Sequence, residues 1–148
     1  MFRTVVYIGE DAELFSRLAG QLQCEGYELQ RASLPTACIE DLLSRWFRVL
    51  ILDVDITTWP GLDFLRRIKQ RDACVPVVVL GDDRGHSLTS IGVARQNGCE
   101  RWICRSRLDP AEFGKVIGDA FRRLEHWKAD LQGISERARR NELSSSLL

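Results

Sequence analysis

The stretch Val49-Leu50-Ile51-Leu52-Asp53 decides the fold of this chain. A run of apolar residues that is followed at once by a carboxylate is typical of a strand buried on both faces and ending at a polar rim. A strand that is covered on both faces needs helices on both sides, which is the arrangement of a parallel sheet. The stretch therefore predicts an α/β protein with Asp53 at the carboxyl end of a central strand.

Other short apolar segments flank this strand and alternate with helical patterns. The further predicted strands are Val5–Ile8, Tyr27–Gln30, Val75–Leu80 and Arg101–Cys104. Apolar residues at helical spacing predict helices around Leu14–Leu22, from Pro35 to Trp46, around Leu62–Ile68, over Ser87–Gln96 and from Asp109-Pro110 onward. Five such strands predict an open five-stranded parallel sheet, a flavodoxin-like (βα)5 architecture with helices on both faces.

The composition narrows the class of protein and its setting. A chain of 148 residues is long enough for one domain. Its 21 Lys and Arg residues balance 21 Asp and Glu residues, so the net charge is zero and we expect no nucleic-acid or membrane partner. Five cysteines without a CxxC pattern favour reduced thiols over a disulfide framework. The N-terminus does not resemble a signal peptide and no apolar stretch is long enough to span a membrane, so we expect a soluble, cytoplasmic protein.

Polar residues follow the predicted strands at the point where each strand ends. They are Glu10 and Asp11, Asp53 and Asp55, Gly81 to Asp83, and Arg105. Because ligands of such sheets bind outside the carboxyl ends of the strands, these residues should meet at one rim. Clustered carboxylates suit Mg²⁺, and a carboxylate can also act as a nucleophile toward phosphorus, with Asp53 the natural candidate. The alternative is that these carboxylates are helix N-caps or solvated loop residues.

The C-terminal helix is predicted to continue well beyond the needs of one domain. Its apolar residues recur at alternating steps of three and four: Ile117, Ala120, Leu124, Trp127, Leu131, Ile134 and Ala138. We expect residues 1–123 to form the domain and residues 124–148 to form an extended helix with a frayed tail. An apolar stripe of Leu124, Trp127, Leu131 and Ile134 would then need a partner, which favours a homodimeric parallel coiled coil or a signalling-helix linker.

Residues 4–122 resemble the receiver domain of two-component response regulators, the CheY-like domains. The resemblance rests on Ile8-Gly9-Glu10-Asp11, Gly26-Tyr27-Glu28-Leu29, Leu52-Asp53, Gly61 to Ile68 and Gly98 to Ile103. It implies that Asp53 accepts a phosphoryl group from a histidine kinase or phosphotransfer protein. It also implies a Mg²⁺ site made by Glu10, Asp11, Asp53 and the backbone carbonyl of Asp55, with Gly81 and Arg105 at the positions that contact the phosphoryl group.

The sequence departs from the family pattern at four positions, which makes it an atypical receiver. Gly9 stands at the first acidic position and weakens the implied Mg²⁺ site. Gly81 replaces the family's hydroxyl residue, Arg105 replaces its lysine, and Ser106 replaces its proline.

Two hypotheses therefore remain open. The first is a phosphoacceptor that signals through dimerisation or the C-terminal helix. The second is an interaction and dimerisation module that works without phosphorylation. A small-ligand-binding flavodoxin-like domain is a minor alternative. We do not expect an enzyme, because the chain has neither a phosphate-cradling glycine-rich loop nor a Ser/His/Asp set that spacing singles out.

Overall fold

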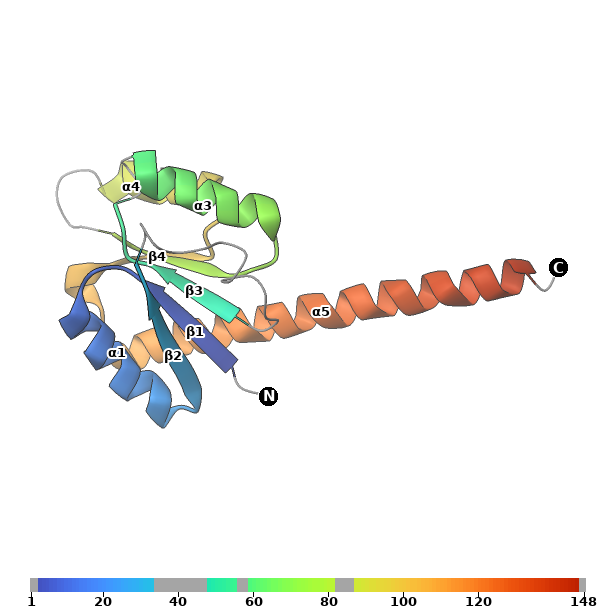
Figure 1. The fold of residues 1–148 in the computed structure, drawn as a ribbon, viewed down its shortest axis with the longest axis horizontal. Coiled ribbons are helices and arrows are strands. Elements are labelled where there is room, and N and C mark those ends of the chain that lie inside the picture. The colour runs from blue at the N-terminus through green and yellow to red at the C-terminus, as the bar shows by residue number, and fades with distance from the viewer. Residues whose placement is uncertain (1–2, 34–47, 56–58, 82–86, 147–148) are drawn as a thin grey trace.

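Five parallel strands form a single sheet at the centre of the molecule (Figure 1). The computed structural model describes residues 3–33, 48–55, 59–81 and 87–146. Within them the strands are β1 (Arg3–Ile8), β2 (Tyr27–Ala32), β3 (Arg48–Leu52), β4 (Val77–Gly81) and β5 (Arg101–Cys104), in the spatial order β2-β1-β3-β4-β5. The predicted five-stranded parallel sheet is confirmed, and the stretch that ends in Asp53 is its central strand.

The predicted fourth strand begins two residues later than its apolar run. Val75 and Pro76 are buried, but the ladder with β3 pairs Leu50 with Val77. Pro76 has no N–H to donate, although its carbonyl oxygen accepts from the backbone nitrogen of Leu50 at 3.0 Å. The helix predicted from Pro35 lies outside the described residues.

Helices cover both faces of the sheet (Figure 1). Helices α1 (Ala12–Cys24) and α5 (Pro110–Ser146) pack on one face, and α3 (Trp59–Arg71) and α4 (Ser87–Gln96) pack on the other. Successive strand residues point to opposite faces, so Val5 and Tyr7 face α1 and α5, whereas Val6 and Ile8 face α3. This alternation produces two hydrophobic layers, one on each side of the sheet.

Helix α5 continues without a break for 37 residues and extends well past the sheet (Figure 1). Leu124 is only 4% exposed and belongs to the core, so the prediction that it is part of the interaction stripe is wrong: the domain needs this turn to complete its own packing. The stripe begins at Trp127 and continues through Leu131 and Ile134, whose exposed fractions are 55%, 50% and 57%. The tail predicted to be frayed is helical as far as Ser146.

Two ion pairs tie α5 to the sheet where the helix leaves the core. Arg3 of β1 pairs with Glu125 at 2.7 Å, and Arg123 pairs with Glu100, just before β5, at 2.6 Å. Exposed pairs of this kind contribute little stability, and α5 is held on the sheet mainly by buried residues such as Phe121 and Leu124. Among the helices that the structure describes, none is both long and apolar enough to cross a membrane.

Candidate functional site

Asp53 lies at the carboxyl end of β3, in the middle of the sheet. Its backbone nitrogen donates to the carbonyl oxygen of Ile8 at 2.8 Å, which continues the pairing of β3 with β1 for one residue beyond the strand. Its side chain is only 3% exposed. A carboxylate this deeply buried needs hydrogen bonds or an opposite charge, because removing it from water is costly.

Two donors bind the same carboxylate oxygen of Asp53. The hydroxyl of Tyr7, from β1, donates to Oδ2, and the Nη2 nitrogen of Arg105 lies 2.9 Å from that same atom. The guanidinium of Arg105 also pairs with Oδ2 of Asp11 at 3.1 Å. The arrangement is therefore a chain of contacts in which one phenol and one cation hold the buried carboxylate.

Burial dominates the acid–base behaviour of this group of residues. Burial raises the pKa of Asp53, while the Tyr7 hydroxyl and the Arg105 charge act in the opposite direction and the Asp11 charge adds to the rise. Burial, together with the hydrogen bond and negative charge of Asp53, raises the pKa of Tyr7 above its ordinary value. Tyr7 therefore keeps its proton and remains a hydrogen-bond donor at neutral pH.

Of the residues predicted to share a metal, Asp11 and Asp53 come together at the guanidinium of Arg105. Asp11 is the N-cap of α1, where its Oδ1 accepts from the backbone nitrogen of Leu14 at 3.0 Å, and Glu10 is exposed. The carbonyl oxygen of Asp55 lies against Gly61 in the first turn of α3. In the part of the chain that the structure describes, no three His, Cys, Asp or Glu side chains are close enough to hold one ion.

Tyr7 occupies the space next to Gly9, where the family has its first acidic residue. A Cβ atom at Gly9 would lie 2.8 Å from the Tyr7 hydroxyl oxygen and 2.9 Å from the Cβ of Asp53. Distances this short cannot be tolerated without a shift of the neighbours. The Tyr7 hydroxyl can therefore lie where it does only because Gly9 has no side chain.

A second aromatic residue fills the space beside Gly81 at the end of β4. A Cβ atom at this glycine would overlap the indole of Trp102, which lies on the neighbouring strand β5. A hydroxyl residue at position 81 could therefore not be accommodated beside the indole in this conformation. Gly81 contributes no side chain to the contacts around Asp53.

The segment after β5 also differs from the family pattern. Arg105, Ser106 and Arg107 form a short 3₁₀ helix, η1, and every peptide bond in the described segments is trans. A trans peptide is expected here, because Ser106 stands in place of the family's proline and cis bonds are strongly disfavoured without proline. The 3₁₀ turn begins at Arg105, whose side chain reaches Asp11 and Asp53.

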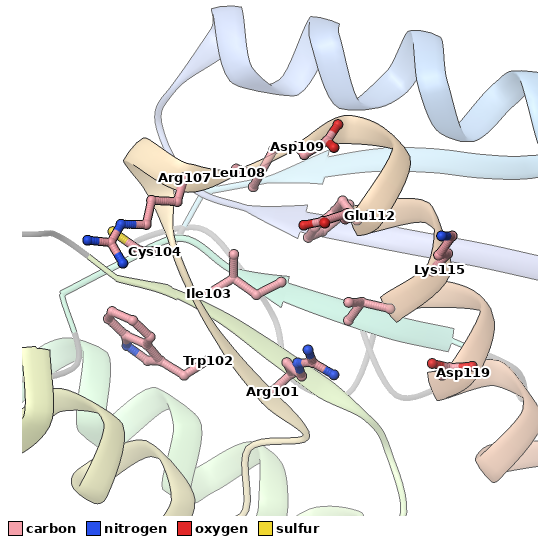
Figure 2. Close-up of a pocket in the computed structure, with 12 residues that line it drawn as sticks. Arg101, Trp102, Ile103, Cys104, Arg107, Leu108, Asp109, Glu112, Lys115 and Asp119 are labelled. Atoms are coloured by element: carbon pink, nitrogen blue, oxygen red, sulfur yellow. The ribbon is translucent and has the colours of Figure 1, made fainter.

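Figure 2 shows a pocket of about 520 Å³ between β5 and the start of α5. Its lining includes Trp102, Arg107 and Glu112, but neither Asp53 nor Tyr7. It is therefore separate from the carboxylate site. Asp82 and Asp83, which were predicted to reach the same rim as Asp53, lie outside the described residues.

Sequence reasoning placed Asp53 and Arg105 at one rim, and the structure brings these two together. It missed Tyr7. The signal was present, because Tyr7 is the one polar-tipped residue in the run Val5 to Ile8, and a buried phenol usually finds a hydrogen-bond partner. The glycine two positions later left room for that hydroxyl.

The solved structures that resemble this chain include receiver domains of response regulators. A receiver domain protein from Clostridium thermocellum is similar over 85% of this chain and 99% of its own, with 19% identity and a TM-score of 0.73. A CheY-like receiver domain protein from Methanospirillum hungatei JF-1 is similar over 85% of this chain and 98% of its own, with 13% identity and a TM-score of 0.71.

A longer protein, NtrX from Brucella abortus in complex with ADP, is 24% identical, with a TM-score of 0.66. The similarity covers 89% of this chain and 29% of NtrX. The sequence profile of the response regulator receiver domain matches residues 5–100. With the sheet order, the central aspartate and this match in agreement, the chain belongs to the family of response regulator receiver domains.

Proposed function

We propose that Asp53 of this receiver domain accepts a phosphoryl group from a histidine kinase or a phosphotransfer protein. The observation that carries the proposal is the pairing of Asp53, at the carboxyl end of the central strand, with the guanidinium of Arg105 at 2.9 Å. This is the edge at which parallel sheets bind their ligands. A cation beside the acceptor stabilises the charge that arrives with a phosphoryl group.

The chemistry of the step follows from how the carboxylate is held. Tyr7 and Arg105 both bind Oδ2, and neither of these bonds involves Oδ1. Oδ1 is therefore the oxygen assigned to attack phosphorus. A P–O bond forms to Asp53, the bond from phosphorus to the donor breaks, and the donor leaves with the electron pair: imidazole from a phosphohistidine, or acetate from acetyl phosphate.

Receiver domains generally bind Mg²⁺ at their acidic pocket, but the residues of this chain do not fit that ion as they are arranged. Asp11 is engaged as a helix cap and as a partner of Arg105, and Oδ2 of Asp53 already has two donors. No step of the proposed reaction is assigned to a metal. Arg105 provides the positive charge instead.

A direct test is incubation with acetyl phosphate followed by intact-protein mass spectrometry under conditions that preserve acyl phosphates. We expect a mass increase of one phosphoryl group, absent in Asp53→Asn. Asp130→Asn is the matched control, because Asp130 lies on the exposed part of α5, with a side chain that is 61% exposed. Labelling that survives Asp53→Asn, or no labelling at all, would refute the assignment.

The exposed apolar stripe of α5 supports a second part of the proposal, a homodimer through this helix. Trp127, Leu131 and Ile134 lie at alternating steps of four and three, which is the spacing that packs against an identical helix in a coiled coil. Each of these side chains is at least half exposed, and a stripe of that kind is stabilised when a second copy covers it.

The dimer is tested by analytical ultracentrifugation across a concentration series. Replacing Trp127, Leu131 and Ile134 with serine should convert a concentration-dependent dimer into a monomer. A control with Arg139→Ser and Arg140→Ser changes the same exposed helix outside the stripe and should leave the dimer intact. If both variants dimerise equally, the interface lies elsewhere.

In this proposal the chain has no catalytic activity apart from accepting the phosphoryl group, and it acts in the cytoplasm. Support for the compartment comes from the cysteines: Cys24, Cys74, Cys99 and Cys104 form no disulfide bond with one another. Free cysteines persist where the surroundings are reducing. Cys38 lies outside the described residues.

A further inference from the structure

We infer that the Tyr7 hydroxyl and the Arg105 guanidinium replace the divalent cation at Asp53, so that this receiver site neither binds nor needs Mg²⁺. Its phosphoryl-transfer part rests on the proposed function, whereas its metal-binding part does not. Tyr7 is assigned as a positioning residue, since it acts by holding the acceptor carboxylate. Three features of the site support the inference.

The first feature is the occupancy of Oδ2. A carboxylate oxygen offers about two lone-pair directions, and the Tyr7 hydroxyl and Arg105 Nη2 both donate to this one atom. Mg²⁺ demands direct oxygen ligands in a strict geometry, so an oxygen that already accepts two hydrogen bonds is a poor ligand. The positive charge that a metal would supply is already present in the guanidinium.

The second feature is the mutual exclusion of Tyr7 and a side chain at position 9. With a Cβ atom 2.8 Å from the Tyr7 hydroxyl oxygen, no acidic residue at Gly9 can coexist with this placement of the ring. The Tyr7 ring is fully buried and lies 5.9 Å from the ring of Phe15, centroid to centroid, so packing fixes it in place. The Tyr7 ring therefore occupies the space that a metal-binding carboxylate at position 9 would need.

The third feature is the engagement of Asp11. Its Oδ1 accepts the capping bond from Leu14 at 3.0 Å, and its Oδ2 pairs with Arg105 at 3.1 Å. A cation between Asp11 and Asp53 would have to displace the guanidinium, which carries the same sign of charge and already bridges both carboxylates. Of the two groups on Asp53, Arg105 is the movable one, because its side chain is 41% exposed and Tyr7 is buried.

Metal binding is tested on the whole chain with Mn²⁺, a paramagnetic substitute for Mg²⁺, followed by electron paramagnetic resonance. We expect no Mn²⁺ site that depends on Asp53 at millimolar metal. A site in the unmodified protein that disappears in Asp53→Asn would overturn the inference. Mn²⁺ that binds equally to both proteins is bound elsewhere, which agrees with it.

Phosphoryl transfer from acetyl phosphate is then compared in Mg²⁺ and in EDTA. Equal labelling rates support the inference. Labelling that requires Mg²⁺ overturns it and leaves the proposed function standing. Labelling in neither condition refutes the proposed function, and the Mn²⁺ measurement then decides the inference by itself.

The role of Tyr7 is tested by Tyr7→Phe, which keeps the ring and removes the hydroxyl. A hydrogen bond to a charged group is worth roughly a factor of ten or more, so labelling in EDTA should fall by about that factor. Added Mg²⁺ should restore part of it, because Oδ2 then has a free lone pair. A variant as insensitive to Mg²⁺ as the unmodified chain would remove Tyr7 from the inference.

The matched control for Arg105 is its neighbour Arg107. Both side chains belong to the 3₁₀ turn η1 and both residues are exposed, but only Arg105 pairs with Asp53. We expect Arg105→Gln to lower labelling in EDTA and Arg107→Gln to leave it unchanged. Equal losses in both variants would contradict the assignment of Arg105 as the charge that replaces the metal.

Discussion

Gly9→Ala would place a single Cβ atom between Tyr7 and Asp53 at the rim of the sheet. That atom would lie 2.8 Å from the Tyr7 hydroxyl oxygen, 2.9 Å from the ring carbon that carries it, and 2.9 Å from the Cβ of Asp53. These neighbours are held by the core and by strand pairing, so they cannot move apart freely. Overpacking of this kind costs about 1–3 kcal/mol, offset by up to about 1 kcal/mol because alanine restricts the unfolded chain more than glycine.

The expected outcome is a net loss of about 1–2 kcal/mol in the free energy of unfolding. At roughly 3–4 °C per kcal/mol for a chain of this size, the melting temperature should fall by about 3–8 °C. Thermal unfolding followed by circular dichroism measures this directly. Gly20→Ala in α1 is the control, because a Cβ atom there has no neighbour within 4 Å. Alanine in a helix interior should stabilise by up to about 1 kcal/mol relative to glycine.

Repeating Gly9→Ala in a variant that lacks the tyrosine ring shows whether the ring causes the loss of stability. In Tyr7→Leu the hydroxyl and the ring carbon are gone, and only the contact with Asp53 remains. We expect Gly9→Ala to cost about half as much there, a coupling of about 1 kcal/mol in a double-mutant cycle. The reasoning is refuted if Gly9→Ala is neutral in the unmodified chain. It is also refuted if the cost is the same with and without the tyrosine ring.

Three further predictions concern charged side chains. Because burial raises the pKa of Asp53, the folded state holds its proton more tightly than the unfolded state, and stability falls as the pH rises through the carboxyl range. In urea unfolding, Asp53→Asn should therefore be more stable than the unmodified chain at neutral pH and lose that advantage in acid. Lys69→Met should lower the unfolding free energy by about 1–2 kcal/mol, since Nζ donates to the carbonyls of Ala73 at 2.9 Å and Val75 at 2.8 Å. Asp11→Ala should cost about 1 kcal/mol by removing the N-cap of α1, which thermal unfolding would detect.

Two of the departures of this chain from its family have an aromatic neighbour in the structure. From the sequence, Gly9 and Gly81 stand at positions where the family has an acidic residue and a hydroxyl residue. In the structure each glycine lies against an aromatic ring, Tyr7 in one case and Trp102 in the other. In this structure, a side chain at either position requires the neighbouring aromatic residue to move or to change.

Much of the fold followed from local patterns in the sequence. Apolar runs that are buried on both faces predict parallel strands, and the carboxyl ends of such strands meet at one rim, which was enough to place Asp53 beside Arg105. Proline and aspartate at 109–110 marked the start of α5, and its uninterrupted apolar spacing predicted a helix longer than the domain requires. The strands, the rim and the long helix could be predicted because they depend on the spacing of apolar residues and on the direction of the strands. Both can be recognised from residues that are close together in the sequence.

Only the tertiary structure decided how the carboxylate of Asp53 is held and where the stripe on α5 begins. Whether Asp11 caps a helix or binds a metal, and whether Leu124 is buried, depends on which side chains from distant elements reach the same volume. The Tyr7 hydroxyl reaches Asp53 because β1 and β3 are neighbours and because Gly9 leaves space for it. The spacing of residues along one chain segment contains no information about that shared space, since it is produced by packing between strands far apart in the sequence.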